Sequence, residues 1–77
     1  MKNEIKWFET EYIRNDITMQ PVMVGNTLWY TLFDSHGYNH VFSTLKGLMD
    51  YVCYGNDWGT GIQFESEEAM IKYLEEI

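Results

Sequence analysis

The pattern of apolar positions repeats in the second half of the chain. Segments 42–52 and 64–74 follow one template, offset by 22 residues, in which a phenylalanine ends an apolar stretch and a helical pattern follows it. A hydroxyl residue, Thr44 or Ser66, stands two positions after each phenylalanine, where a helix N-cap is expected. The template therefore predicts a strand followed by a helix, used twice, and convergence explains it as well as duplication does.

Each of these two helices carries an apolar stripe. In the first helix, four apolar residues recur with the i, i+3, i+4, i+7 spacing of one helix face. Tyr54 points away from that stripe, so we expect it to be exposed. Equivalent positions of the two copies hold similar residues, and Tyr51 matches Tyr73. The residues expected to be buried are Leu45, Leu48, Met49, Val52, Phe64, Met70 and Leu74.

Alternating side chains predict a β-hairpin before the first helix. Both faces of segment 27–33 are apolar, which is typical of a central strand. Residues 34–37 have turn chemistry, and Gly37 suits a positive φ. Segment 38–42 then returns as the antiparallel partner.

The first 26 residues allow more than one interpretation. Residues 5–13 fit both a helical stripe and an alternating strand face, and their β-rich composition favours a strand. Pro21 restricts the segment around it, because a proline cannot donate to a sheet ladder. That segment is expected to be a short edge strand or an ordered loop.

Together these elements predict an α+β fold in a single domain, residues 1–77. N-terminal β segments and the hairpin precede strand, helix, strand and helix. A strand–helix–strand crossover within one sheet is right-handed and joins parallel strands. The strand ending at Phe42 is thus expected to run parallel to segment 62–65 in a small mixed sheet, with two helices on one face. The other face would be left for a partner, a second copy or the N-terminal segment.

Composition narrows the possible partners. Twelve acidic and five basic residues give a formal net charge of −7, which disfavours direct binding to nucleic acid or to an anionic membrane. No apolar run reaches the length of a membrane span, and the N-terminus has no signal-peptide core. The lone Cys53 cannot form an intramolecular disulfide. We therefore expect a cytoplasmic protein.

Motifs for catalysis are missing from the sequence. His36 and His40, with Asp34 nearby, would lie partly in the hairpin turn and partly in a strand, so we expect polar turn and cross-strand residues rather than metal ligands. Cys53 follows the inward-facing Val52, which favours a partly buried structural cysteine. We expect no enzymatic activity, no cofactor and no metal.

Two features are candidate binding surfaces. The first is the C-terminal segment, where five glutamates and the single Lys72 give a local charge of −4. The second is the end of the first helix, because tyrosine and tryptophan dominate binding hot spots. Each has a plainer interpretation, a solvated helix face or a tryptophan folded onto the core. The candidate partner-binding residues are Glu65, Glu68, Glu75, Glu76, Tyr54, Asp57 and Trp58.

The chain is short, acidic, aromatic-rich and free of catalytic motifs, and in this it is similar in style to small phage-encoded inhibitors and nucleic-acid mimics. That similarity lies in composition alone. It implies a protein-binding module whose carboxylates imitate phosphates and cover a basic site on another protein. The alternatives are a structural or regulatory domain that forms a homodimer through the open sheet face, centred on Trp29 or Leu32, and a small-molecule binder.

Overall fold

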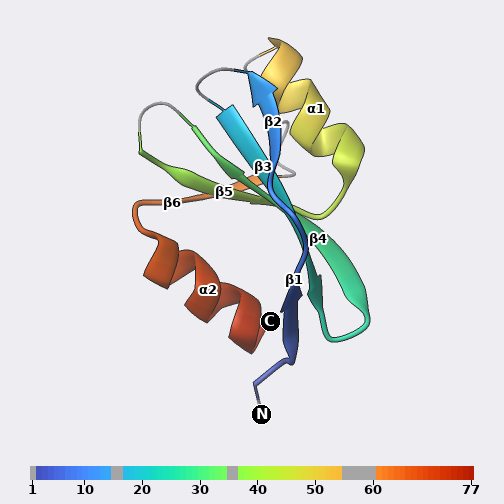
Figure 1. Cartoon of the computed structure of the whole chain (residues 1–77). Helices are drawn as coiled ribbons and strands as arrows, with labels where there is room; N and C mark the ends of the chain where they lie inside the picture. The colour runs from blue at the N-terminus through green and yellow to red at the C-terminus, as the bar shows by residue number, and fades with distance from the viewer. Residues whose placement is uncertain (1, 15–16, 35–36, 55–60) are drawn as a thin grey trace.

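Six strands form one antiparallel sheet, and two helices pack against it (Figure 1). The structure is a computed structural model that describes residues 2–14, 17–34, 37–54 and 61–77. The α+β fold predicted from the sequence is confirmed. Its elements are β1 (Ile5–Trp7), β2 (Glu11–Arg14), β3 (Ile17–Val24), β4 (Thr27–Phe33), β5 (Asn39–Phe42), α1 (Leu45–Tyr54), β6 (Gly61–Phe64) and α2 (Glu67–Glu76).

The sheet has the strand order β1-β3-β4-β5-β6, and β2 also pairs with β3. β1 pairs with one half of β3 and β2 with the other half, so the two short strands follow the same side of β3. The strand interpretation of the N-terminal segment is therefore confirmed. The β4–β5 hairpin is confirmed as well, with Leu32 opposite His40.

Pro21 lies inside a long interior strand, so the expectation of an edge strand or loop was wrong. β3 has eight residues and is paired on both sides. The backbone N–H of Phe8 donates to the Pro21 carbonyl at 3.0 Å, in the gap between β1 and β2. The amide and carbonyl of one strand residue point to the same side. The N–H that proline lacks would therefore face this gap, where no ladder bond is lost.

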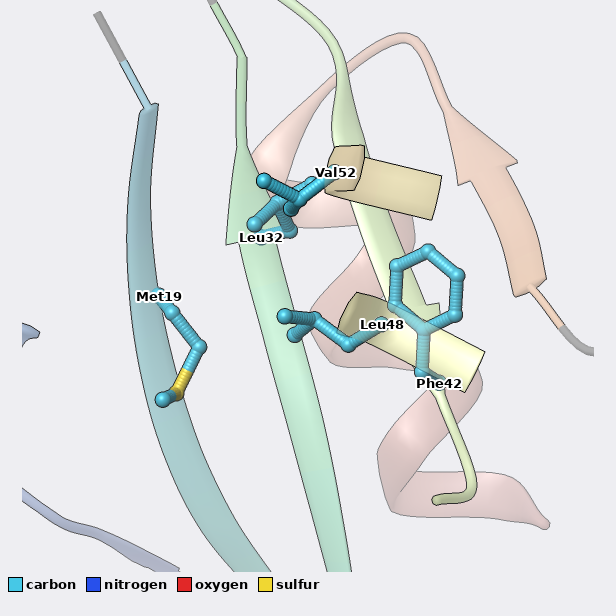
Figure 2. Close-up of a cluster of buried hydrophobic side chains, with 5 residues drawn as sticks. All are labelled: Met19, Leu32, Phe42, Leu48 and Val52. Carbon is cyan, nitrogen blue, oxygen red and sulfur yellow. The ribbon is translucent and has the colours of Figure 1, made fainter. Parts of the chain in front are cut away.

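The two helices cover opposite faces of the sheet. Met19, Leu32 and Phe42 pack against Leu48 and Val52 of α1 (Figure 2). We call this side of the sheet the α1 face. A second cluster packs against α2 on the other side, which we call the α2 face. Its residues are Val22, Val24, Val41, Met70 and Leu74. Because consecutive strand residues point to opposite faces, all four residues of β5 are buried.

The prediction of a mixed sheet with both helices on one face is corrected by the direction of β6. β6 runs antiparallel to β5, with Gly61 opposite Phe42 and Phe64 opposite Asn39. The chain thus re-enters the sheet beside the end of β5, whereas parallel pairing would require it to return beside the start. In this register Phe42 shares its face with Gly61, and Phe64 points to the opposite face.

Each helix packs on the face that holds the phenylalanine of its own strand. The rings of Phe42 and Tyr51 have centroids 5.7 Å apart, at an interplanar angle of 47°. Phe64 and Tyr73 repeat this contact at 5.4 Å and 46°. The repeated sequence template therefore corresponds to a repeated ring contact, and it is the alternation of faces along the sheet that separates the two helices.

The rotation of α1 differs from the predicted stripe. Leu48 and Val52 are buried as expected, but Leu45 and Met49 are 45% and 41% exposed. The contact centre is shifted toward Tyr51, whose ring lies 4.8 Å from that of His40 as well as against Phe42. The sheet covers only part of the apolar stripe of α1. The packing of Tyr51 against His40 and Phe42 decides that the side of the stripe with Leu45 and Met49 stays exposed.

The other residues predicted to be buried lie on the α2 face. Met70 and Leu74 are buried, whereas Phe64 is only partly buried because β6 is the edge strand. Both predicted N-caps are confirmed. Thr44 Oγ1 accepts from the Gly47 N–H at 3.0 Å, and Ser66 Oγ accepts from the Ala69 N–H at 3.2 Å.

Replacing Leu48 with Ala should lower the free energy of unfolding by about 2–5 kcal/mol, because Leu48 is fully buried. Leu45→Ala is the matched control on the exposed flank of the same helix, and it should cost less than about 1 kcal/mol. Chemical denaturation of the two variants compares them directly. Equal losses would show that α1 is rotated as the stripe predicted.

Replacing Gly61 with Ala should destabilise the fold by about 1–3 kcal/mol, as overpacking does. A Cβ at this position would overlap the Phe42 ring, with Cδ1 and Cζ at 3.0 Å. Gln63→Ala, at an exposed position of the same strand, should change stability by no more than about 0.5 kcal/mol. Denaturant titration measures both, and an unchanged Gly61→Ala protein would contradict this register.

Candidate functional site

Glu68 and Glu76 lie on the outward side of α2, and Glu65 precedes the helix; we call these three residues the acidic surface. All three residues are exposed, and Met70 and Leu74 direct the opposite side of the helix into the core. Lys72 is exposed as well, about one turn from both Glu68 and Glu76, and within the described residues it makes no ion pair. Three carboxylates and one ammonium leave a net negative charge here. Glu68 and Glu76 are eight residues apart, about 12 Å along the helix axis.

Glu75 differs from the prediction because the N-terminal segment lies along the end of α2. Its side chain is 32% exposed and is 4.0 Å from Lys2 Nζ. The Asn3 backbone N–H donates to the Glu75 carbonyl at 2.7 Å, and Asn3 Nδ2 donates to the carbonyls of Leu74 and Ile77 at 3.1 and 2.7 Å. Asn3 thus donates hydrogen bonds to carbonyls at the C-terminal end of α2, which have no donor within the helix. Figure 1 shows the two chain ends close together.

The aromatic end of α1 is separate from the acidic surface. Tyr54 is 74% exposed, as predicted, but it ends the helix on the opposite face of the sheet from α2 (Figure 1). Asp57 and Trp58, the other two candidates of this region, lie outside the described residues. On the present geometry Tyr54 and the acidic surface cannot meet one flat partner surface.

The Asp34 and His40 side chains form a buried pair that the sequence interpretation missed. Asp34 Oδ2 and His40 Nε2 are 2.7 Å apart, and the two side chains are 9% and 5% exposed. Asp34 Oδ1 also accepts from the Tyr38 N–H at 3.1 Å. The signal was available in the hairpin register, because with Leu32 opposite His40, residue 34 is a diagonal neighbour on the same face. The pair joins the end of β4 to β5 within the hairpin.

The other candidates for chemistry give no site in the described part of the chain. His36 lies outside the described residues. Cys53 is exposed, so the expected partial burial was wrong; the shift of α1 toward Tyr51 turns it outward. No group of three or more His, Cys, Asp or Glu among the described residues could hold a metal ion. None of the described helices is long and apolar enough to cross a membrane.

A polar cavity of about 200 Å³ lies on the α2 face, beside the first turn of α2. The sequence interpretation missed it, although polar residues occupy alternate positions of β3 on a face that is otherwise apolar. The strands contribute residues that are adjacent across β3, β4 and β5, and α2 contributes Glu67. Its polar lining residues are Thr10, Thr18, Gln20, Thr31, Asn39 and Glu67, and its rings are those of Trp7 and Phe33.

An apolar hollow of about 490 Å³ lies at the edge of the sheet where β1 gives way to β2. It is lined by Phe8, Glu9, Glu11, Pro21, Met23 and Leu28. The residues expected at the centre of a homodimer are elsewhere and covered: Leu32 is 1% exposed beneath α1, and Trp29 is partly buried against the α2 cluster.

No protein-family model matches the chain, and neither a curated protein nor a solved structure matches it. The basis for a functional proposal is therefore the geometry and charge of these surfaces. Of them, the acidic surface combines exposure with unbalanced charge, and the polar cavity opens beside the same helix.

Replacing Asn3 with Ala should lower the free energy of unfolding by about 1–2 kcal/mol, because two carbonyls of the α2 terminus lose their donor. Lys2→Ala is the matched control. Its side chain is 71% exposed, and exposed ion pairs contribute about 0–1 kcal/mol. Thermal or chemical denaturation measures both variants. An Asn3→Ala protein as stable as wild type would contradict the capping role.

Proposed function

We propose that the protein is a small acidic protein-binding module that covers a basic site on a partner protein, in the manner of an inhibitor. The observation that carries the proposal is the acidic surface, whose three carboxylates are exposed and outnumber the single ammonium of Lys72 beside them. α1 offers a contrast. There Lys46 Nζ donates to Asp50 Oδ2 at 2.7 Å, and this hydrogen bond raises the pKa of Lys46. The opposite charges on that helix thus offset each other.

The charge of α2 supports recognition of a basic site. The helix has ten residues, of which four are glutamates and one is a lysine. The glutamates lie in pairs at the two ends of the helix, which is about 15 Å long at 1.5 Å per residue. With Lys72 between the two pairs, α2 carries a net charge of −3. A basic groove on a partner would therefore meet a negatively charged helix whose carboxylates are concentrated at its two ends.

Electrostatic attraction would act mainly on the rate of association. The net charge of −7 extends the field of the acidic surface beyond the contact itself, and complementary fields steer encounter. Exposed charges are screened beyond roughly 8 Å at physiological ionic strength. Binding through this surface should therefore slow markedly as salt is added.

Self-association is the second candidate, and the apolar hollow favours it. Phe8 and Leu28 expose 40% and 36% of their surface there. Measurement of the mass in solution separates the two candidates, because a monomer leaves the hollow uncovered and leaves binding to a basic partner unaffected.

Reversing two charges of the acidic surface should weaken binding while leaving the fold intact. The partner is first captured from the source cell on immobilised protein and purified. The Glu68→Lys/Glu76→Lys protein should then associate with it about tenfold more slowly or worse, because steering is lost. Both residues are exposed, so stability should change by no more than about 0.5 kcal/mol per substitution.

The matched control is Glu9→Lys/Glu11→Lys, which changes the net charge equally at exposed residues near the edge of the sheet. Its association rate should remain within about threefold of wild type at physiological salt. Equal slowing of both double variants would show that the net charge of the protein, and not the acidic surface, sets the association rate. Binding that survives the α2 reversals and high salt would overturn the proposal.

A further inference from the structure

The polar cavity exists because α2 covers only part of its sheet face. The helix packs on Val22, Val24 and Val41. Gln20 and Thr31 continue the row of Val41 across β4 and β3, away from the valine cluster. Thr18, Phe33 and Asn39 form the next row of the same face. These residues line the cavity, with Glu67 at its rim.

Asn39 shows that the cavity lacks a hydrogen-bonding group. The residue is 8% exposed and lines the cavity, yet its side-chain amide makes no hydrogen bond to any described residue. Enclosed side-chain N and O atoms of the described residues all have partners, so this amide is open to the cavity. Water or a polar group of a ligand that enters the cavity can therefore form a hydrogen bond with it.

The cavity lining offers several oxygen acceptors and one carboxylate, alongside the N–H and O–H donors of Asn39, Thr10 and Thr18. Thr31 Oγ1 donates its proton to the Gln20 carbonyl at 2.8 Å, which leaves oxygen lone pairs. Gln20 Nε2 is occupied by the Phe8 carbonyl at 2.9 Å, which leaves the amide oxygen. Glu67 adds an exposed carboxylate, and the lining contains no Lys, Arg or His. A cation with several N–H donors complements this set, whereas an anion does not.

Size and ring chemistry favour a single arginine side chain. The volume of about 200 Å³ is below the roughly 300–1,000 Å³ of pockets for drug-sized ligands. Trp7 and Phe33 line the cavity, and the two residues are 36% and 49% exposed. Aromatic rings attract a guanidinium by stacking and cation–π interaction. A guanidinium supplies five donors in one plane, which suits several acceptors on different elements.

The helix dipole does not oppose a cation here. An N-terminus favours anions through a partial charge of about +0.5, but two glutamates occupy the first turn of α2 and Ser66 already accepts from Ala69. The net local charge is thus negative.

We infer that the polar cavity receives the guanidinium group of an arginine side chain of the partner protein, with Glu67 as its counter-ion and Asn39 as a hydrogen-bonding partner. This inference rests on the proposed function, because it names the residue of the basic partner that α2 would recognise. The arginine side chain would enter the cavity beside the first turn of α2, and the acidic surface would contact the other basic residues of the partner.

The test is an NMR titration of the ¹⁵N-labelled protein with the tripeptide acetyl-Gly-Arg-Gly-amide. The Asn39 side-chain amide and the Trp7 indole N–H should shift and saturate. The peptide with citrulline in place of arginine has nearly the same shape and no charge, and it should bind at least about tenfold more weakly, as should the lysine peptide. Glu67→Gln should weaken arginine binding about tenfold, and Glu4→Gln, an exposed control outside the cavity and the acidic surface, should not.

Three results would overturn the inference: equal binding of the arginine and citrulline peptides, equal binding of the arginine and lysine peptides, or equal effects of Glu67→Gln and Glu4→Gln. Glu67 is exposed, so its substitution leaves the fold intact. The titration contains no partner protein. Its failure would thus remove the arginine site, whereas failure of the proposed function would appear separately, in the charge-reversal experiment.

Discussion

The pairing of Gly61 with Phe42 is the constraint on which the rest of the structure depends. The glycine leaves room for the Phe42 ring, which would overlap a side chain at that position. It also sets the register of β6, and a slip of one residue would turn every side chain of a strand to the other face. In the observed register Phe64 points away from the α1 face and packs with Tyr73 of α2. One close backbone contact thereby decides which side of the sheet the second helix covers.

Because the helices lie on opposite faces, the buried aromatic and polar packing is on the α1 face, whereas the cavity and the acidic surface are next to α2. On the α1 face, aromatic rings and the buried pair of Asp34 and His40 pack around β5. The α2 face combines a partial apolar core with an uncovered polar part, and α2 carries its unbalanced carboxylates outward. Because the cavity opens beside the first turn of this helix, charge attraction and specific hydrogen bonding can act on the same partner. That arrangement is the physical basis of the proposed function.

Local patterns predicted the parts of this fold that depend on neighbouring residues. The caps Thr44 and Ser66, the hairpin and the buried positions of α2 follow from spacing along one element. The direction of β6 could not be predicted in this way, since it depends on a contact between residues 19 positions apart. The rotation of α1 depends on the ring of Tyr51 against His40 of another element. For the site, exposed carboxylates were predictable from helical spacing, whereas the cavity arises from rows across three strands.

Nuclear Overhauser contacts from the methyl groups of the two helices test the central arrangement most directly. The account predicts that Leu74 methyls contact Val41 methyls and that Leu48 methyls contact the Phe42 ring. It also predicts no contact from α2 methyls to the α1 face and none from α1 methyls to the α2 face. Contacts from Leu74 to Leu32 or Phe42 would place both helices on one face and would contradict the account.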